Sequence, residues 1–193
     1  MYNIVVTPNK VLLEKAKPVK QFDAKLKKII SEMEDTLIAT KDPIGVGLAA
    51  PQVGLSIRLF QMKPTEKSKV TTYINPEIIN MSGGEEIPHY TNSKSVENKK
   101  PESSKNKLLE GCLSIPDIWG NVTRKKEVTL AWQDSDGNKF TQVFTGFPAI
   151  IIQHEVDHLN GILFTTHVMS QGEKLFKSHK NKEGEDEFDE IQI

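Results

Sequence analysis

Two histidines and a glutamate in the last quarter of the chain have the types and spacing that could bind a metal ion. The run Gln153-His154-Glu155-Val156-Asp157-His158 places His154 and His158 one helical turn apart. At 3.6 residues per turn both imidazoles would face one ion, and Glu155 would lie beside it. A carboxylate in that place can act as the general base for a water molecule. The same spacing also occurs on solvated helices, so the motif alone leaves the question open.

A catalytic metal ion held by two histidines needs a third protein ligand. Downstream, His167 is nine residues past the motif and lacks the glycine-containing spacing typical of such a ligand. Upstream, Cys112 is the only cysteine and lies in the run Leu109-Glu110-Gly111-Cys112-Leu113-Ser114-Ile115-Pro116. A lone cysteine is often a small buried hydrophobe. The neighbouring glycine and proline indicate a constrained backbone, however, and they favour Cys112 as the third ligand.

The histidine motif must be positioned by a helix, which we predict over residues 149–160. Pro148 suits the first turn of a helix, and Gly161 suits the position after its last turn. Isoleucines occupy 150–152 before the motif and Leu159 follows it, so the helix is apolar on nearly all sides and should be buried. Burial of two histidines and two acids is costly unless they are paired or coordinated, which strengthens the metal interpretation.

The other elements predict an α+β fold in one domain. Residues 21–40 carry apolar side chains at steps of three and four, the pattern of an amphipathic helix. Residues 53–59 and 70–75 are predicted strands, the second stopped by Pro76, and residues 127–132 and 140–145 are predicted to pair through a tight turn at Asp136-Gly137. We expect antiparallel strands packed around the buried helix that carries the histidine motif near the C-terminus.

Two polar segments interrupt this pattern. Residues 80–107 hold few apolar side chains and are predicted to form a surface insertion, mobile at least in part; a lid over a site is the less frequent use of such a loop. Residues 171–193 carry lysines followed by an acidic block, which predicts a charged, mobile tail. The predicted catalytic domain therefore covers residues 1–170.

Composition excludes several classes of protein. The chain has 193 residues with 25 Lys and Arg against 26 Asp and Glu, so it lacks the basic excess of a sequence-independent nucleic-acid binder. No apolar run approaches the roughly 20 residues of a membrane span. The start, Met1-Tyr2-Asn3-Ile4-Val5-Val6, lacks the features of a signal peptide. We expect a cytoplasmic protein in which the single cysteine stays reduced.

Three motifs in order resemble the signatures of the peptide deformylases. Gly45-Val46-Gly47-Leu48-Ala49-Ala50-Pro51-Gln52 is similar to the first, Glu110-Gly111-Cys112-Leu113-Ser114 to the second, and the histidine motif to the third. The resemblance covers roughly residues 5 to 165. It implies hydrolysis of the N-formyl group from the formyl-methionine of newly synthesised proteins, with release of formate. The implied partners are N-formylmethionyl peptides and, through them, the ribosome.

The resemblance also implies roles for individual residues. Cys112, His154 and His158 would hold one divalent metal ion, Fe²⁺ being expected and Zn²⁺ or Ni²⁺ being replacements. Glu155 would be the general base, and Gln52 with the backbone N–H of Leu113 would stabilise the oxyanion. A larger set would bind or support the substrate and ligands: Gly45 and Gly47 beside the peptide, Ile150, Ile151 and Phe147 around the methionine, and the ion pair of Glu110 with Arg124 beside the cysteine loop.

Two other interpretations stay open. A zincin-type metallopeptidase would take its third ligand after His158 and would need neither Cys112 nor Gln52. A metal-binding interaction protein without catalytic activity would lack at least one catalytic group. For Ile150 and Ile151, plain core packing is an equal alternative, and for Glu110 with Arg124 the alternative is a surface ion pair.

Overall fold

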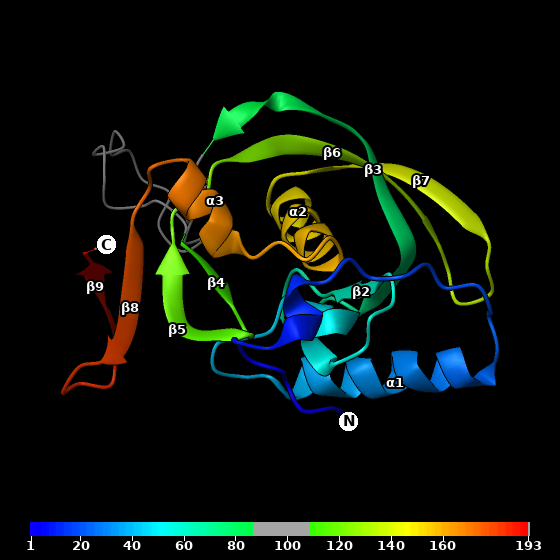
Figure 1. The fold of residues 1–193 in the computed structure, drawn as a ribbon, viewed down its shortest axis with the longest axis horizontal. Coiled ribbons are helices and arrows are strands. Elements are labelled where there is room, and N and C mark those ends of the chain that lie inside the picture. Colours follow the sequence, from blue (N-terminus) through cyan, green and yellow to red (C-terminus); the bar gives the residue numbers. More distant parts are fainter. Residues whose placement is uncertain (87–108, 193) are drawn as a thin grey trace.

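The computed structural model describes residues 1–86 and 109–192, which form two antiparallel sheets and the helices that pack on them (Figure 1). The larger sheet has the order β1-β2-β3-β6-β7 and the smaller one β4-β5-β8-β9. The strands are β1 (Gly47–Ala49), β2 (Leu59–Met62), β3 (Thr71–Glu86), β4 (Glu110–Cys112), β5 (Ile115–Gly120), β6 (Arg124–Gln133), β7 (Lys139–Thr145), β8 (Leu175–Lys180) and β9 (Asp186–Ile191). The helices are α1 (Ala24–Ala39), α2 (Phe147–Leu159) and α3 (Phe164–Ser170), with 3₁₀ turns η1 (Lys10–Leu13) and η2 (Ala50–Val53).

Helix α2 is the central element of the core. It packs against strands β1, β2, β3, β6 and β7, and Figure 1 shows it enclosed beneath the curved strands β3, β6 and β7. Ile152 and Leu159 are fully buried in the main hydrophobic cluster together with Phe60 and Leu130. This arrangement confirms the predicted α+β fold with antiparallel strands around a buried helix.

Both ends of α2 are fixed by the residues that the sequence singled out. Pro148 lies in the first turn, where its missing N–H costs no helical hydrogen bond. After the last turn Gly161 adopts a left-handed φ of 73° and donates its N–H to the carbonyl of His158 at 3.1 Å. Ile162 donates to the carbonyl of Asp157 at 2.9 Å, which completes a Schellman motif. The helix therefore ends immediately after its second histidine.

Helix α1 packs on a second hydrophobic cluster, as its periodicity predicts. Asp23 caps its first turn by accepting the N–H of Leu26 at 2.9 Å. Leu26, Met33 and Leu37 are buried against η2 and β2 in this cluster. None of the helices in the described ranges is long and apolar enough to cross a bilayer.

Two predicted strand boundaries are wrong. The strand predicted over residues 53–59 begins only at Leu59, because η2 and a left-handed Gly54 occupy the chain before it. The strand predicted to stop at Pro76 instead runs to Glu86, with a shift of register between Ile74 and Glu77. A bulge tolerates proline because the ladder needs no N–H at that position.

The predicted insertion over residues 80–107 is also wrong in its first part. Residues 80–86 continue β3 and pair with β6, with glycines at 83 and 84 in left-handed conformations beside another register shift. Pairing with β6 gives these residues backbone hydrogen bonds on one edge, even though their side chains are mostly polar. Residues 87–107 lie outside the described residues.

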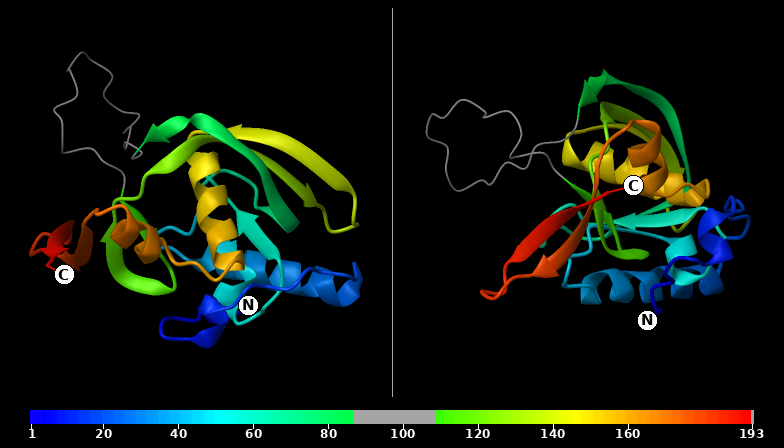
Figure 2. Two further views of the ribbon diagram at one scale, coloured as in Figure 1. Left: turned by 45° about the horizontal axis from the view of Figure 1, so that its top comes forward. Right: turned by 60° about the vertical axis from the view of Figure 1, so that its left-hand side comes forward.

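The predicted mobile tail is replaced by a hairpin. Residues 175–177 pair with β5, and residues 186–191 pair with residues 175–180 (Figure 2). The basic and acidic blocks lie opposite each other: Lys180 contacts Asp186 at 2.8 Å, and Lys174 contacts Glu190 at 2.6 Å. Charged residues of opposite sign on neighbouring strands stabilise the pairing of these strands, so the two blocks form a hairpin and not a mobile tail.

Candidate active site

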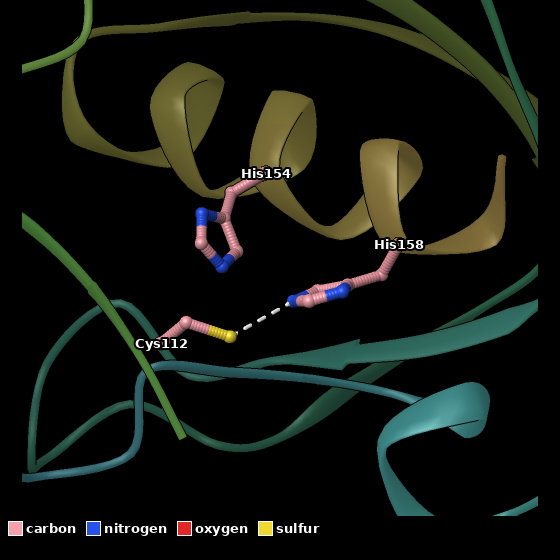
Figure 3. Close-up of side chains that lie close together, drawn as sticks. All are labelled: Cys112, His154 and His158. Carbon is pink, nitrogen blue, oxygen red and sulfur yellow. Dashed lines mark hydrogen bonds between the residues drawn. The ribbon is translucent and has the colours of Figure 1, made fainter. Parts of the chain in front are cut away.

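The three predicted metal ligands converge on one point. His154 and His158 project from α2 toward Cys112 at the end of β4 (Figure 3). The Sγ of Cys112 lies 3.2 Å from Nε2 of His158, and the ligand atoms of the three residues lie within 4.8 Å of one another. Within residues 1–86 and 109–192 this is the only group of three or more His, Cys, Asp or Glu side chains close enough to hold an ion.

The environment of Cys112 favours a thiolate. Burial by itself raises the pKa of this thiol, but the two histidine rings that face the sulfur outweigh burial and lower the pKa to about 5. The thiolate is the form that binds metals. Cys112 is therefore more than a small buried hydrophobe, although it does pack with Phe164 and Val168.

A buried ionic network of Arg124 and Glu110 contacts His154, one of the predicted ligands. Arg124 donates from Nε and Nη2 to the two oxygens of Glu110 at 2.7 and 2.9 Å, and Glu110 Oε2 lies 3.1 Å from Nδ1 of His154. Glu110 and Arg124 are 7% and 6% exposed, so the pair is not a surface pair. Burial raises the pKa of Glu110, but the hydrogen bonds from Arg124 and His154 prevail and hold it at about 2.

The same network explains Asp157 and His167. Asp157 accepts from Nη1 of Arg124 at 2.7 Å and contacts Nε2 of His167 at 2.9 Å through the same oxygen. Nε2 of His167 is therefore engaged by Asp157, and His167 is not part of the group formed by Cys112, His154 and His158. No signal in the sequence marks this contact, because it depends on how α3 packs against α2.

The Glu155 carboxylate occupies space that is free only because residue 47 is a glycine. A Cβ at Gly47 would overlap the Glu155 carboxylate and approach Cγ2 of Ile151 at 3.0 Å. Glu155 is 3% exposed, and its Oε2 has no hydrogen-bond partner among the described residues. Burial raises its pKa to about 7. Gly47 thus leaves room for the carboxylate of Glu155, a role that the sequence did not indicate.

Gln52 presents its amide NH₂ to the same site. Its Oε1 accepts the N–H of Ala49 at 2.8 Å, and this bond turns Nε2 toward Cys112 Sγ, 3.5 Å away. The N-terminal segment holds both loops of the site, because Val5 donates to the carbonyl of Gln52 at 2.8 Å and Thr7 donates to that of Ser114 at 3.0 Å. These two backbone contacts leave no pattern of residue types, so the sequence does not predict them.

The remaining predicted residues differ in their burial. Leu113 follows Cys112 and is half-buried, Ile150 is half-buried, and Phe147 is 39% exposed. Ile151 is 3% exposed and belongs to the main core cluster. A Cβ at Gly45 would meet Leu37 and Thr40, away from Glu155.

The donor set fits a divalent metal ion. A thiolate and two imidazoles are ligands that Zn²⁺ and Fe²⁺ both accept. Glu110 occupies Nδ1 of His154, which leaves Nε2 of that ring as the nitrogen available to an ion. A carboxylate behind a ligating histidine is the usual device that fixes its tautomer and orientation.

Comparison with known proteins agrees with this site. The sequence model of the polypeptide deformylase family matches residues 1–174. The peptide deformylase of Chlorobium luteolum is 37% identical over 161 residues, 81% of this chain and 72% of that protein. The peptide deformylase of Christiangramia forsetii is 34% identical over 190 residues, 91% of this chain and 85% of that protein. The crystal structure of peptide deformylase from Thermotoga maritima has a TM-score of 0.71 at 36% identity, covering 86% of this chain and 97% of that one.

The family match covers residues 1–174 and therefore includes all three motifs that carry the site residues. The match to the solved structure extends the agreement from sequence to fold. The chain therefore belongs to the peptide deformylase family, whose members are metal-dependent hydrolases.

Proposed function

We propose that this chain removes the N-formyl group from the formyl-methionine of newly synthesised proteins, releasing formate and a free N-terminus. The observation that carries the proposal is the convergence of Cys112, His154 and His158 within 4.8 Å beside the buried carboxylate of Glu155. These three side chains would hold one divalent ion, and we propose Fe²⁺, with Zn²⁺ or Ni²⁺ as replacements.

Glu155 would carry the proton in the reaction. A metal ion held by the three ligands would supply Lewis acidity and lower the pKa of a water molecule. Because burial raises the pKa of Glu155 above its ordinary value, its carboxylate is a stronger base than an exposed one and can accept a proton and return it to the departing amine. Its low exposure keeps bulk water from competing for that proton.

Gln52 and Leu113 would stabilise the negative charge that develops on the formyl oxygen. The Gln52 amide is already oriented, because Ala49 occupies its carbonyl oxygen and leaves the NH₂ group facing the site. The second donor would be the backbone N–H of Leu113. A donor of this kind is typically worth roughly 3–4 kcal/mol in acyl-transfer enzymes.

The substrate would lie along the segment that holds Gly45 and Gly47. We propose that Phe147 and Ile150, which retain exposed surface on the first turns of α2, contact the methionine side chain, and that Ile151 supports this wall from the core. Glu110 and Arg124 would act behind the ligands, through Nδ1 of His154.

The proposal is tested by measuring formate release from a formyl-Met peptide with anaerobically prepared, iron-loaded protein. Glu155→Ala should keep its metal and lose activity, because the acid touches the reacting groups without ligating the ion. Cys112→Ser should lose both. Cleavage of internal peptide bonds without formate release would instead favour a zincin-type peptidase, and full metal content in Cys112→Ser would refute the ligand assignment.

A cytoplasmic location and a contact with the ribosome complete the proposal, because the substrate is the N-terminus of a nascent chain. Co-sedimentation with translating ribosomes measures this contact. Recovery of the protein only in the ribosome-free fraction would refute it without affecting the hydrolytic function.

A further inference from the structure

The C-terminal hairpin, which we define as β8 and β9 (residues 175–191), lies beyond the residues that the family model matches. It joins the smaller sheet through β5, where Phe176 lies opposite Trp119. Strand β5 pairs in turn with β4, which ends at Cys112. Figures 1 and 2 place the hairpin beside β5 in every view. Only β5 therefore separates the hairpin from the strand of a proposed metal ligand.

The link between the hairpin and that strand is the indole of Trp119. Gly111 lies between Glu110 and Cys112 and directly opposite Trp119. A Cβ at Gly111 would come within 2.7 Å of Cε3 and Cζ3 of the indole, so the ring lies against the glycine backbone. Because side chains alternate along a strand, the ring covers the face opposite to the one from which Glu110 and Cys112 project.

The C-terminal hairpin holds this ring by two contacts. The indole Nε1 donates to Oγ of Ser178 at 3.1 Å. The ring of Phe188 meets the indole edge-on, with centroids 5.7 Å apart and an interplanar angle of 88°. On the other face, Leu175 packs into the same cluster as Cys112. The hairpin thus packs on both faces of the smaller sheet, on the face that carries Trp119 and on the face that carries Cys112.

We propose that the C-terminal hairpin braces the metal site, and that Trp119 is a positioning residue acting through the backbone of Gly111. Glycine is the most conformationally free residue, and its two neighbours carry the thiol ligand and the carboxylate that orients His154. Restricting Gly111 therefore restricts Cys112 and Glu110 together. The inference rests on the proposed role of Cys112 as a ligand.

The test uses the full-length chain with both hairpin contacts removed and the indole kept, as Ser178→Ala with Phe188→Ala. Trp119→Ala is less suitable because it leaves a void beside Gly111. His179→Ala is the control, since this exposed β8 side chain forms its ion pairs with Glu187 and Asp189 of β9 and, among the described residues, none with β4 or β5. Metal-free protein is titrated with Co²⁺ against a competing chelator, and the thiolate-to-cobalt absorption is recorded with the thermal midpoint.

We expect the double variant to bind Co²⁺ about 10-fold more weakly, a loss typical of changing a residue that supports a metal ligand. Its thiolate-to-cobalt absorption should also be weaker. The control variant should match wild type in both measurements. Wild-type affinity and absorption in the double variant would overturn the inference, even if its thermal midpoint falls. An equal loss in His179→Ala would overturn the role of Trp119. Absence of thiolate absorption in wild type would refute the proposed ligand set itself, which separates the two failures.

Discussion

Replacing Gly47 by alanine is a direct test of the position assigned to Glu155. Gly47 has no left-handed φ, so alanine fits the backbone, and the only obstacle is space. The new methyl group would overlap the Glu155 carboxylate and press on Ile151. The acid is the movable partner, because Ile151 is held in the core cluster. The substitution should therefore displace the general base and leave the three ligands in place.

The expected loss of activity in Gly47→Ala follows from the displacement of the Glu155 carboxylate. General acid–base catalysis by a positioned group contributes roughly 10²–10⁴-fold, which corresponds to about 2.7–5.4 kcal/mol of activation free energy. Overpacking of this kind typically costs about 1–3 kcal/mol of stability. We expect kcat/KM for a formyl-Met peptide to fall by at least about 10²-fold in Gly47→Ala, with metal content unchanged.

Gly45→Ala is the matched control, two residues away in the same segment. Its methyl group would approach Leu37 and Thr40 instead of Glu155. We therefore expect lower stability and, because Gly45 lies beside the proposed peptide path, a higher KM, but a much smaller loss of kcat than in Gly47→Ala. The assays are formate release, metal content and urea unfolding on both variants. Near wild-type kcat/KM in Gly47→Ala, or an equal loss of kcat in Gly45→Ala, would refute the reasoning that Gly47 exists to seat Glu155.

Arg124→Leu leaves the carboxylates of Glu110 and Asp157 without their buried cation, so we expect the free energy of unfolding in urea to fall by about 3–5 kcal/mol, and an unchanged value would contradict the network. The pKa of Glu110 is about 2 in the folded protein, below its ordinary 4.5, so the stability it supplies is complete above pH 4.5 and is lost as pH falls toward 2. The Glu110→Gln variant should show a flatter dependence of unfolding free energy on pH over that interval, and an identical slope would argue against this assignment. In metal-free protein the lowered pKa of Cys112, about 5, predicts a rate of alkylation by iodoacetamide that is constant from about pH 7 to 9 and is suppressed by added metal. A rate that rises through that range would show an ordinary thiol.

Most of the chemistry could be predicted from the sequence because it is encoded over short distances along the chain. The spacing of His154 and His158 fixes their common direction on any helix, and Gly161 fixes the end of that helix. The three family motifs identify Cys112 and Gln52, although they are 60 residues apart, only because the motifs are known as a set. The charge blocks near the C-terminus predict a mobile tail where the structure has a hairpin, because a one-dimensional pattern does not show which strand lies opposite which.

The sequence by itself determined the ligand types, the buried helix and the amphipathic helix α1, all of which depend on local periodicity. The tertiary structure alone decided what surrounds each group. It joined Asp157 to Arg124 and His167, seated the Glu155 carboxylate against Gly47, and laid the Trp119 indole on the strand of Cys112. These contacts join residues far apart in the chain, and their energies depend on burial, which exists only once the sheets have closed around α2.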